Sequence, residues 1–108
     1  MNARLVLTTC ADRATAESLG RTLVEERLAA CVNVLPGIRS IYRWHGQIEA
    51  AEECLLLVKT SRERYDAAAA RLIELHPYQV PELLAFDVAD GSAAYLGWLA
   101  ASVDPRGA

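Results

Sequence analysis

The sequence contains no apolar run near the length of a membrane span, no excess of basic residues and no closely spaced cysteines. A helix that crosses a bilayer needs about 20 apolar residues in succession, so we expect no membrane span. The formal net charge of -3 gives no positive field that would attract nucleic acid or an anionic membrane surface. Since no secretory signal pattern precedes the first strand-like run, we expect a cytoplasmic protein.

The cysteines are three in number, Cys10, Cys31 and Cys54, and they are widely spaced. This pattern is neither a disulfide framework nor a C-x-x-C metal or redox motif. Reduced thiols in a cytosolic protein are the simplest account. Motifs of the G-x-S-x-G and G-x-x-x-x-G-K types, which carry a serine nucleophile or a phosphate loop, are also missing, so we expect no enzyme.

What is present indicates one compact domain over residues 1–108, since 53% of the residues are hydrophobic and 23% are charged. Strand patterns occupy residues 5–9, 32–44, 48–60 and 83–88. Helices are expected after the N-cap residues Asp12, Ser61 and Ser92. The order β-α-β-β-α-β plus a C-terminal helix is that of the α+β ferredoxin-like fold, an antiparallel sheet with its two main helices on one face.

Helical spacing predicts which side chains of the two main helices are buried. In the first helix these are Leu19, Leu23, Val24 and Leu28, and in the second Tyr65, Ala69, Leu72 and Ile73. The run at residues 54–58 is apolar at every position, which predicts a central strand that is covered on both faces.

The middle two strands form a long hairpin. Pro36-Gly37 predicts a bulge and His45-Gly46 a turn. Arms over residues 32–44 and 48–60 reach about 40 Å, whereas a domain of this size has a radius of gyration of about 13 Å. The hairpin should therefore project, and exposed aromatics such as Tyr42 and Trp44 favour a homo-oligomer built by strand addition. A short hairpin with a frayed tip is the alternative.

Residues 76–82 read His-Pro-Tyr-Gln-Val-Pro-Glu. Each proline removes a backbone donor and pushes the residue before it toward extended geometry. The segment is thus a rigid connector that presents His76, Tyr78 and Glu82. Such loops often bind ligands. On these residues alone, the simpler interpretation is a stiff connection with Tyr78 packed inward.

Several motifs in order resemble the CutA divalent-cation tolerance proteins. They are Ala30-Cys31-Val32-Asn33, Pro36-Gly37, the stretch 40–49, Lys59-Thr60, His76-Pro77-Tyr78 with Pro81-Glu82, and Tyr95-Leu96 with Trp98. The resemblance runs from about Leu5 to Ser102. It implies a ferredoxin-like protomer, a homotrimer similar in layout to the PII-type signalling proteins, and a role in tolerance of copper and other divalent metals.

The resemblance also implies a metal site. A copper site in this family has been linked to a cysteine at the end of the first strand and to histidines just before the Pro-Tyr pair. His76 matches one of these histidines, but Leu75 replaces the other, and Thr8 holds the place of the cysteine. Cys10 lies two positions further along the same strand face. Cys10, His76 and Glu82 are therefore the candidate ligands for copper or another divalent metal.

Two other classes of function stay open. A PII-like signalling or scaffold trimer would bind a small ligand or a protein in clefts between subunits, with Lys59, Arg43 and Tyr78 as candidate cleft residues. The alternative without a ligand is that the aromatic side chains are buried in the core of a trimer interface and that Lys59 forms an ion pair with a carboxylate such as Glu82. The aromatics in question are Tyr42, Trp44 and Trp98. An enzyme with a Cys10–His76 nucleophile is the third class, and nothing in the spacing demands it.

Overall fold

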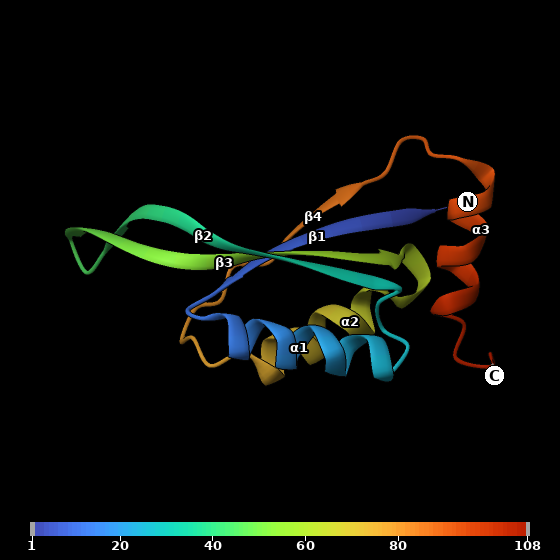
Figure 1. Ribbon diagram of the computed structural model, residues 1–108, viewed down its shortest axis with the longest axis horizontal. Helices are drawn as coiled ribbons and strands as arrows, with labels where there is room; N and C mark the ends of the chain where they lie inside the picture. Colours follow the sequence, from blue (N-terminus) through green and yellow to red (C-terminus); the bar gives the residue numbers. More distant parts are fainter. Residues whose placement is uncertain (1, 108) are drawn as a thin grey trace.

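The four strands of the computed structural model form one antiparallel sheet in the order β2-β3-β1-β4 (Figure 1). The structure describes residues 2–107. The strands are β1 (Ala3–Cys10), β2 (Cys31–Trp44), β3 (Gln47–Ser61) and β4 (Leu84–Asp87), and the helices are α1 (Arg13–Glu25), α2 (Arg62–Leu75) and α3 (Ala93–Ser102). This topology confirms the predicted ferredoxin-like fold with a C-terminal helix.

The three helices begin where the sequence predicts. The side chains of Asp12, Ser61 and Ser92 each accept a hydrogen bond from the backbone N–H three residues further on, at 2.7, 3.1 and 3.2 Å. Helix α2 ends at His76, which has extended geometry ahead of Pro77. Within residues 2–107, none of the helices is long and apolar enough to cross a membrane.

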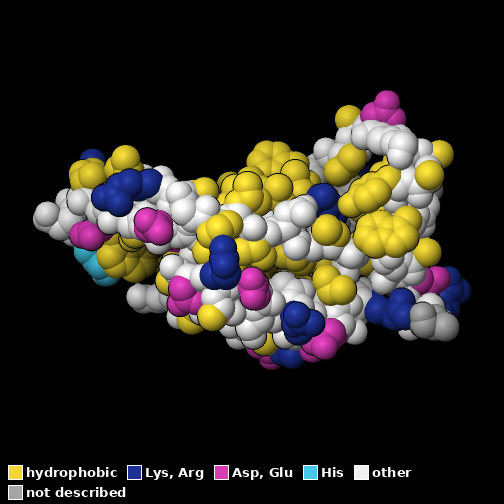
Figure 2. Space-filling view, in the orientation of Figure 1, with side chains coloured by type: hydrophobic (Ala, Val, Ile, Leu, Met, Phe, Trp, Pro, Cys, Tyr) yellow, Lys and Arg dark blue, Asp and Glu magenta, His cyan; other side chains and the backbone are white. Residues whose placement is uncertain are grey.

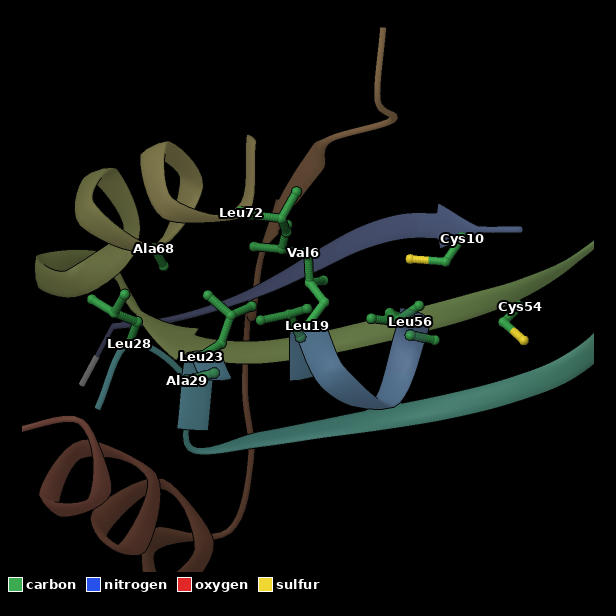
Figure 3. Packing of buried hydrophobic residues seen from close by; sticks show 12 residues of the cluster. Val6, Cys10, Leu19, Leu23, Leu28, Ala29, Cys54, Leu56, Ala68 and Leu72 are labelled. Atoms are coloured by element: carbon green, nitrogen blue, oxygen red, sulfur yellow. The ribbon is translucent and has the colours of Figure 1, made fainter. Parts of the chain in front are cut away.

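Helices α1 and α2 cover one face of the sheet and enclose the core (Figures 1 and 3). Leu23, Leu56 and Leu72 are its largest buried side chains. The predicted burial of Val24 and Ile73 is wrong, because these side chains are 41% and 53% exposed. Each follows directly after a core residue, and one step along a helix turns the side chain by about 100° away from the buried stripe.

The β2–β3 hairpin projects from the body, as predicted, and gives the molecule extents of 45 × 25 × 22 Å (Figure 1). The register shifts between Leu35 and Ile38, which confirms the bulge at Pro36-Gly37. The ladder between β1 and β3 ends at the pair Cys10 and Cys54. Beyond it, residues 38–53, which we call the ribbon, form a two-stranded arm in the described chain.

The other face of the sheet is covered only at one end, where α3 packs against Ala3 and Ala30. Antiparallel partners share a face, so the register defines an apolar surface that we call the open face: Leu5, Leu7, Leu55, Leu57, Leu84 and Phe86. Figure 2 shows hydrophobic side chains gathered over the middle of the molecule, away from α1 and α2. The run 54–58 is thus covered on one face of the protomer, not on both as predicted.

Candidate functional site

His76 lies where α2 gives way to the Pro77 connector, and its side chain is 93% buried, with 7% exposed. The backbone N–H of Tyr78 donates to its Nδ1 at 3.1 Å. Because Nδ1 accepts, Nε2 carries the hydrogen and donates it to the Thr9 carbonyl oxygen at 2.7 Å. Both ring nitrogens are therefore used in holding the connector against the end of β1.

Cys10, the last residue of β1, lies beside this imidazole, with Sγ 3.7 Å from Nε2. The side chain is completely buried. Burial raises its pKa to about 11, helped by the nearby Cys54, Asp12 and Glu53. The thiol therefore stays protonated at neutral pH. Nucleophilic attack and metal binding both need the thiolate form of cysteine. The fold does not favour that form of Cys10, so the pair of Cys10 and His76 is not prepared for either reaction.

Tyr78 links the proline-containing connector to the base of the ribbon through a hydrogen bond. Its hydroxyl donates to Glu53 Oε2 at 2.6 Å, and Glu53 is buried. Burial and this carboxylate together hold the pKa of Tyr78 well above its usual range. Glu53 was not predicted as a site residue, and its one signal in the sequence is a carboxylate directly before an apolar run. The inward packing of Tyr78 is the alternative that the structure favours.

The three predicted metal ligands do not assemble in one protomer. Glu82 is exposed and makes no hydrogen bond or ion pair within residues 2–107. No group of three or more His, Cys, Asp or Glu side chains in that part of the chain could hold a metal ion. Thr8, at the position of the family's cysteine, has a buried hydroxyl without a hydrogen-bond partner among the described residues. One hydroxyl does not replace a thiolate, so the protomer does not fit the implied copper site.

The predicted cleft residues are also separated in the protomer. Lys59 lies at the end of the open face, with Nζ 5.8 Å from the ring centre of Tyr95 in α3. Arg43 pairs with Ile48 near the tip of the ribbon, and Tyr78 lies at the end of β1. Lys59 forms no ion pair with a carboxylate in residues 2–107, so the predicted Lys59–Glu82 pair is not formed there.

The aromatics predicted for a trimer interface are all at the surface of the protomer. Tyr42 and Trp44 lie on the ribbon, and Trp98 lies on α3 with its ring 5.4 Å from that of Tyr95. Each is at least 40% exposed. Buried polar contacts thus lie at the base of the ribbon, whereas apolar surface lies along the ribbon, the open face and α3.

These features define a class of protein, a ferredoxin-like protomer with a projecting β-ribbon. The model of the CutA1 divalent ion tolerance protein family matches residues 4–102. The chain belongs to this family.

Known relatives are similar to this chain in sequence and structure along nearly its whole length. The Divalent-cation tolerance protein CutA of Thermus thermophilus is 47% identical over 95 residues, which is 88% of this chain and 92% of the relative. A crystal structure of CutA from Xylella fastidiosa superposes with a TM-score of 0.92 at 47% identity and covers 94% of this chain and 98% of its own. CutA from Archaeoglobus fulgidus, described as periplasmic, gives a TM-score of 0.91 at 32% identity, covering 94% and 99%.

Proposed function

We propose that the protein acts as a homotrimer in the response to divalent metal ions. The observation that carries the assembly is the open face, where Leu84 and Phe86 are 53% and 50% exposed. Contiguous apolar surface of this kind marks a protein interface. The family and the name of the Thermus thermophilus relative support the metal response.

The ribbon supports a ring of subunits. Ile41 and Ile48 on it are 73% and 63% exposed, and such an arm in isolation is an aggregation hazard. Packing the ribbon of one copy against a different surface of the next is a heterologous contact, which forms a closed ring when the rotation between copies closes. Three subunits is the number that the resemblance to CutA proteins implies.

Copper binding at Cys10, His76 and Glu82 has a high structural cost. A metal on either nitrogen of His76 would break its hydrogen bond to Thr9 or to Tyr78. The Cys10 thiol would also have to lose its proton in a buried place. We therefore expect the metal response to operate without tight copper binding at these three residues.

Lys59 supports a second candidate function, a trimer that binds an anionic ligand or a partner protein between its subunits. The residue is half-buried at the edge of an apolar surface, with Nζ beside the Tyr95 ring, and it forms no ion pair within residues 2–107. A cation that loses part of its hydration at an apolar surface favours an acidic counterpart, which a second copy or a ligand can supply.

We further propose that the protein is not an enzyme and acts in the cytoplasm. Cys10 is not activated as a nucleophile, because its thiol is protonated and the adjacent His76 donates its Nε2 hydrogen to the Thr9 carbonyl, so it cannot accept the thiol proton there. The free state of Cys10, Cys31 and Cys54 suits a reducing compartment. Cell fractionation tests the location, and recovery in a periplasmic or secreted fraction would contradict it.

Native mass spectrometry of the reduced protein, with and without a few equivalents of copper, tests the main proposal. We expect a species at three times the protomer mass of 11.8 kDa, without stoichiometric copper, and the same spectrum for His76→Ala. A trimer that gains three coppers and loses them in His76→Ala would overturn our view of the metal site. A monomer would overturn the assembly.

A further inference from the structure

The loop between β4 and α3 contains the dipeptide Asp90-Gly91, the one place in the sequence where a glycine follows an aspartate or an asparagine. Residues 88–92 belong to no helix or strand, and both residues of the dipeptide are exposed. Figure 1 shows this loop at the edge of the molecule, on the side away from α1 and α2. Solvent therefore reaches the pair, and the loop has the freedom of a surface connection.

The backbone nitrogen of Gly91 lies against the side chain of Asp90. Its N–H donates to Asp90 Oδ1 at 2.8 Å. Because Oδ1 is bonded to Cγ, the carboxyl carbon is held close to the same nitrogen. Gly91 has no Cβ that would hinder their approach, and within residues 2–107 the Asp90 carboxylate forms no ion pair that would fix it elsewhere. The backbone nitrogen can therefore attack this carboxyl group.

We propose that Asp90-Gly91 is a site of spontaneous isoaspartate formation. The Gly91 nitrogen bonds to Asp90 Cγ, and a carboxyl oxygen leaves as water with the amide hydrogen, which closes a succinimide ring. Water then opens the ring at one of its two carbonyl carbons. Opening at Cγ restores aspartate. Opening at the backbone carbonyl carbon gives isoaspartate, in which the chain runs through Cβ and Cγ. One water is released and one is consumed, so the net change is an isomerisation.

The other four aspartates are less well placed for this reaction. Asp12 accepts a hydrogen bond from the N–H of Thr15 at 2.7 Å, which turns its carboxylate toward α1. Asp66 lies within α2. Asp87 ends β4 before a valine, whose branched side chain hinders ring closure. Asp104 precedes a proline, which has no N–H to lose. The reaction should therefore be confined to Asp90.

The isomerisation would change the start of α3. Ser92, directly after the pair, caps α3 by accepting from the N–H of Tyr95 at 3.2 Å. A Cβ on Gly91 would lie 3.3 Å from Leu96 Cγ, so this backbone is in close contact with a side chain that packs against the Leu99 and Val103 cluster. Isoaspartate adds one carbon to the backbone at this point, which should displace the cap and loosen α3. This inference does not depend on the proposed role in the metal response.

Digestion with Asp-N protease tests the inference, because this protease cleaves before aspartate but not before isoaspartate. Fresh protein is compared with protein kept folded for several weeks at physiological temperature and neutral pH. Cleavage before Asp87, Asp90 and Asp104 gives the peptides 87–89 and 90–103 from fresh protein. We expect the aged protein to give a growing share of the uncut peptide 87–103, with cleavage at the other four aspartates unchanged.

Methylation and two variants identify the product. Protein isoaspartyl methyltransferase should add one methyl group to the tryptic peptide 72–106 of aged protein. Asp90→Glu keeps the carboxylate but would need a six-membered ring, so the methylation should be lost. Gly91→Ala keeps Asp90 and adds a Cβ beside the attacking nitrogen, so it should lower the rate of methyl-group gain.

A synthetic peptide of residues 86–93, aged in parallel, reports how the same sequence reacts without the fold. If this peptide accumulates isoaspartate while the folded protein stays fully cleavable before Asp90, the inference is overturned. Isoaspartate at any of the other four aspartates, with Asp90 intact, would overturn it as well.

Discussion

Thr8 carries a hydroxyl that is fully buried between β1 and the helices and has no hydrogen-bond partner within residues 2–107. An unsatisfied buried polar group costs about 1–3 kcal/mol. Thr8→Val keeps the shape and removes the polar atom, so we expect the free energy of unfolding to rise by about 1 kcal/mol. Urea unfolding at fixed protein concentration measures the change.

Thr60→Val is the matched control for that substitution. Thr60 is equally buried, but its hydroxyl donates to the Leu28 carbonyl at 2.7 Å. Its replacement leaves a buried carbonyl without a donor, so stability should fall by about 1 kcal/mol or more. Equal effects of the two substitutions would contradict this account of the strand β1 hydroxyl.

The pKa of Cys10 makes stability depend on pH at the alkaline end. Its pKa is 9.0 for a thiol free of the fold, as in the unfolded chain, and burial raises it to about 11 in the folded protein. Between these values the unfolded state loses its proton first, so the free energy of unfolding falls as pH rises. The free energy of unfolding of Cys10→Ala should fall less over the same pH range, as measured by urea titrations run in parallel. Curves of the same slope would show that the folded-state thiol is not shifted.

Residues whose roles are set by near neighbours could be predicted from the sequence. Asp12 caps α1 and His76 ends α2, because a side chain three residues away or an adjacent proline decides each case. The bond between Tyr78 and Glu53 joins residues 25 apart. This hydrogen bond forms only because the end of β1 lies beside that part of β3, and a local sequence pattern carries no information about that tertiary arrangement.

Among the elements, the β2–β3 hairpin depends most on its special backbone positions. Gly37, in the bulge, has φ +78 and open space around a built Cβ. Gly37→Ala should therefore cost about 1–2 kcal/mol from backbone strain alone. Gly97, inside α3, also has open space but no positive φ, so Gly97→Ala should gain up to about 1 kcal/mol.

Thermal unfolding of both glycine variants beside the wild type checks this contrast. A bulge that accepts alanine without loss would mean that the register shift between Leu35 and Ile38 does not need the left-handed conformation.

Element types and order could be read from the sequence, because caps, Pro-Gly and strand periodicity are local signals. Burial on helix faces could be read only in part. Val24 and Ile73 fit a helical stripe in the sequence, yet they lie outside the surface that the sheet covers. Which edge of a stripe meets the sheet depends on the packing angle of the helix, and that is a tertiary property.

At the scale of the whole molecule, the open face and the ribbon leave large apolar side chains exposed in the protomer. The length of the two hairpin strands predicted the projecting ribbon. The open face followed only from the register, which places Leu84 and Phe86 beside Leu5 and Leu7 on the side away from α1 and α2. A sequence pattern shows that a strand is apolar on both faces, but it does not show which of the two faces the protomer leaves uncovered.

Sedimentation equilibrium of Phe86→Glu beside Ile73→Glu is the most direct test of assembly through the open face. The two side chains are almost equally exposed in the protomer, at 50% and 53%, but Phe86 lies on the open face and Ile73 on the outside of α2. We predict a trimer for the wild type and for Ile73→Glu, and dissociated protomers for Phe86→Glu, because a buried unpaired charge is costly. A trimer that survives Phe86→Glu, or a wild type that sediments as a monomer, would contradict the account.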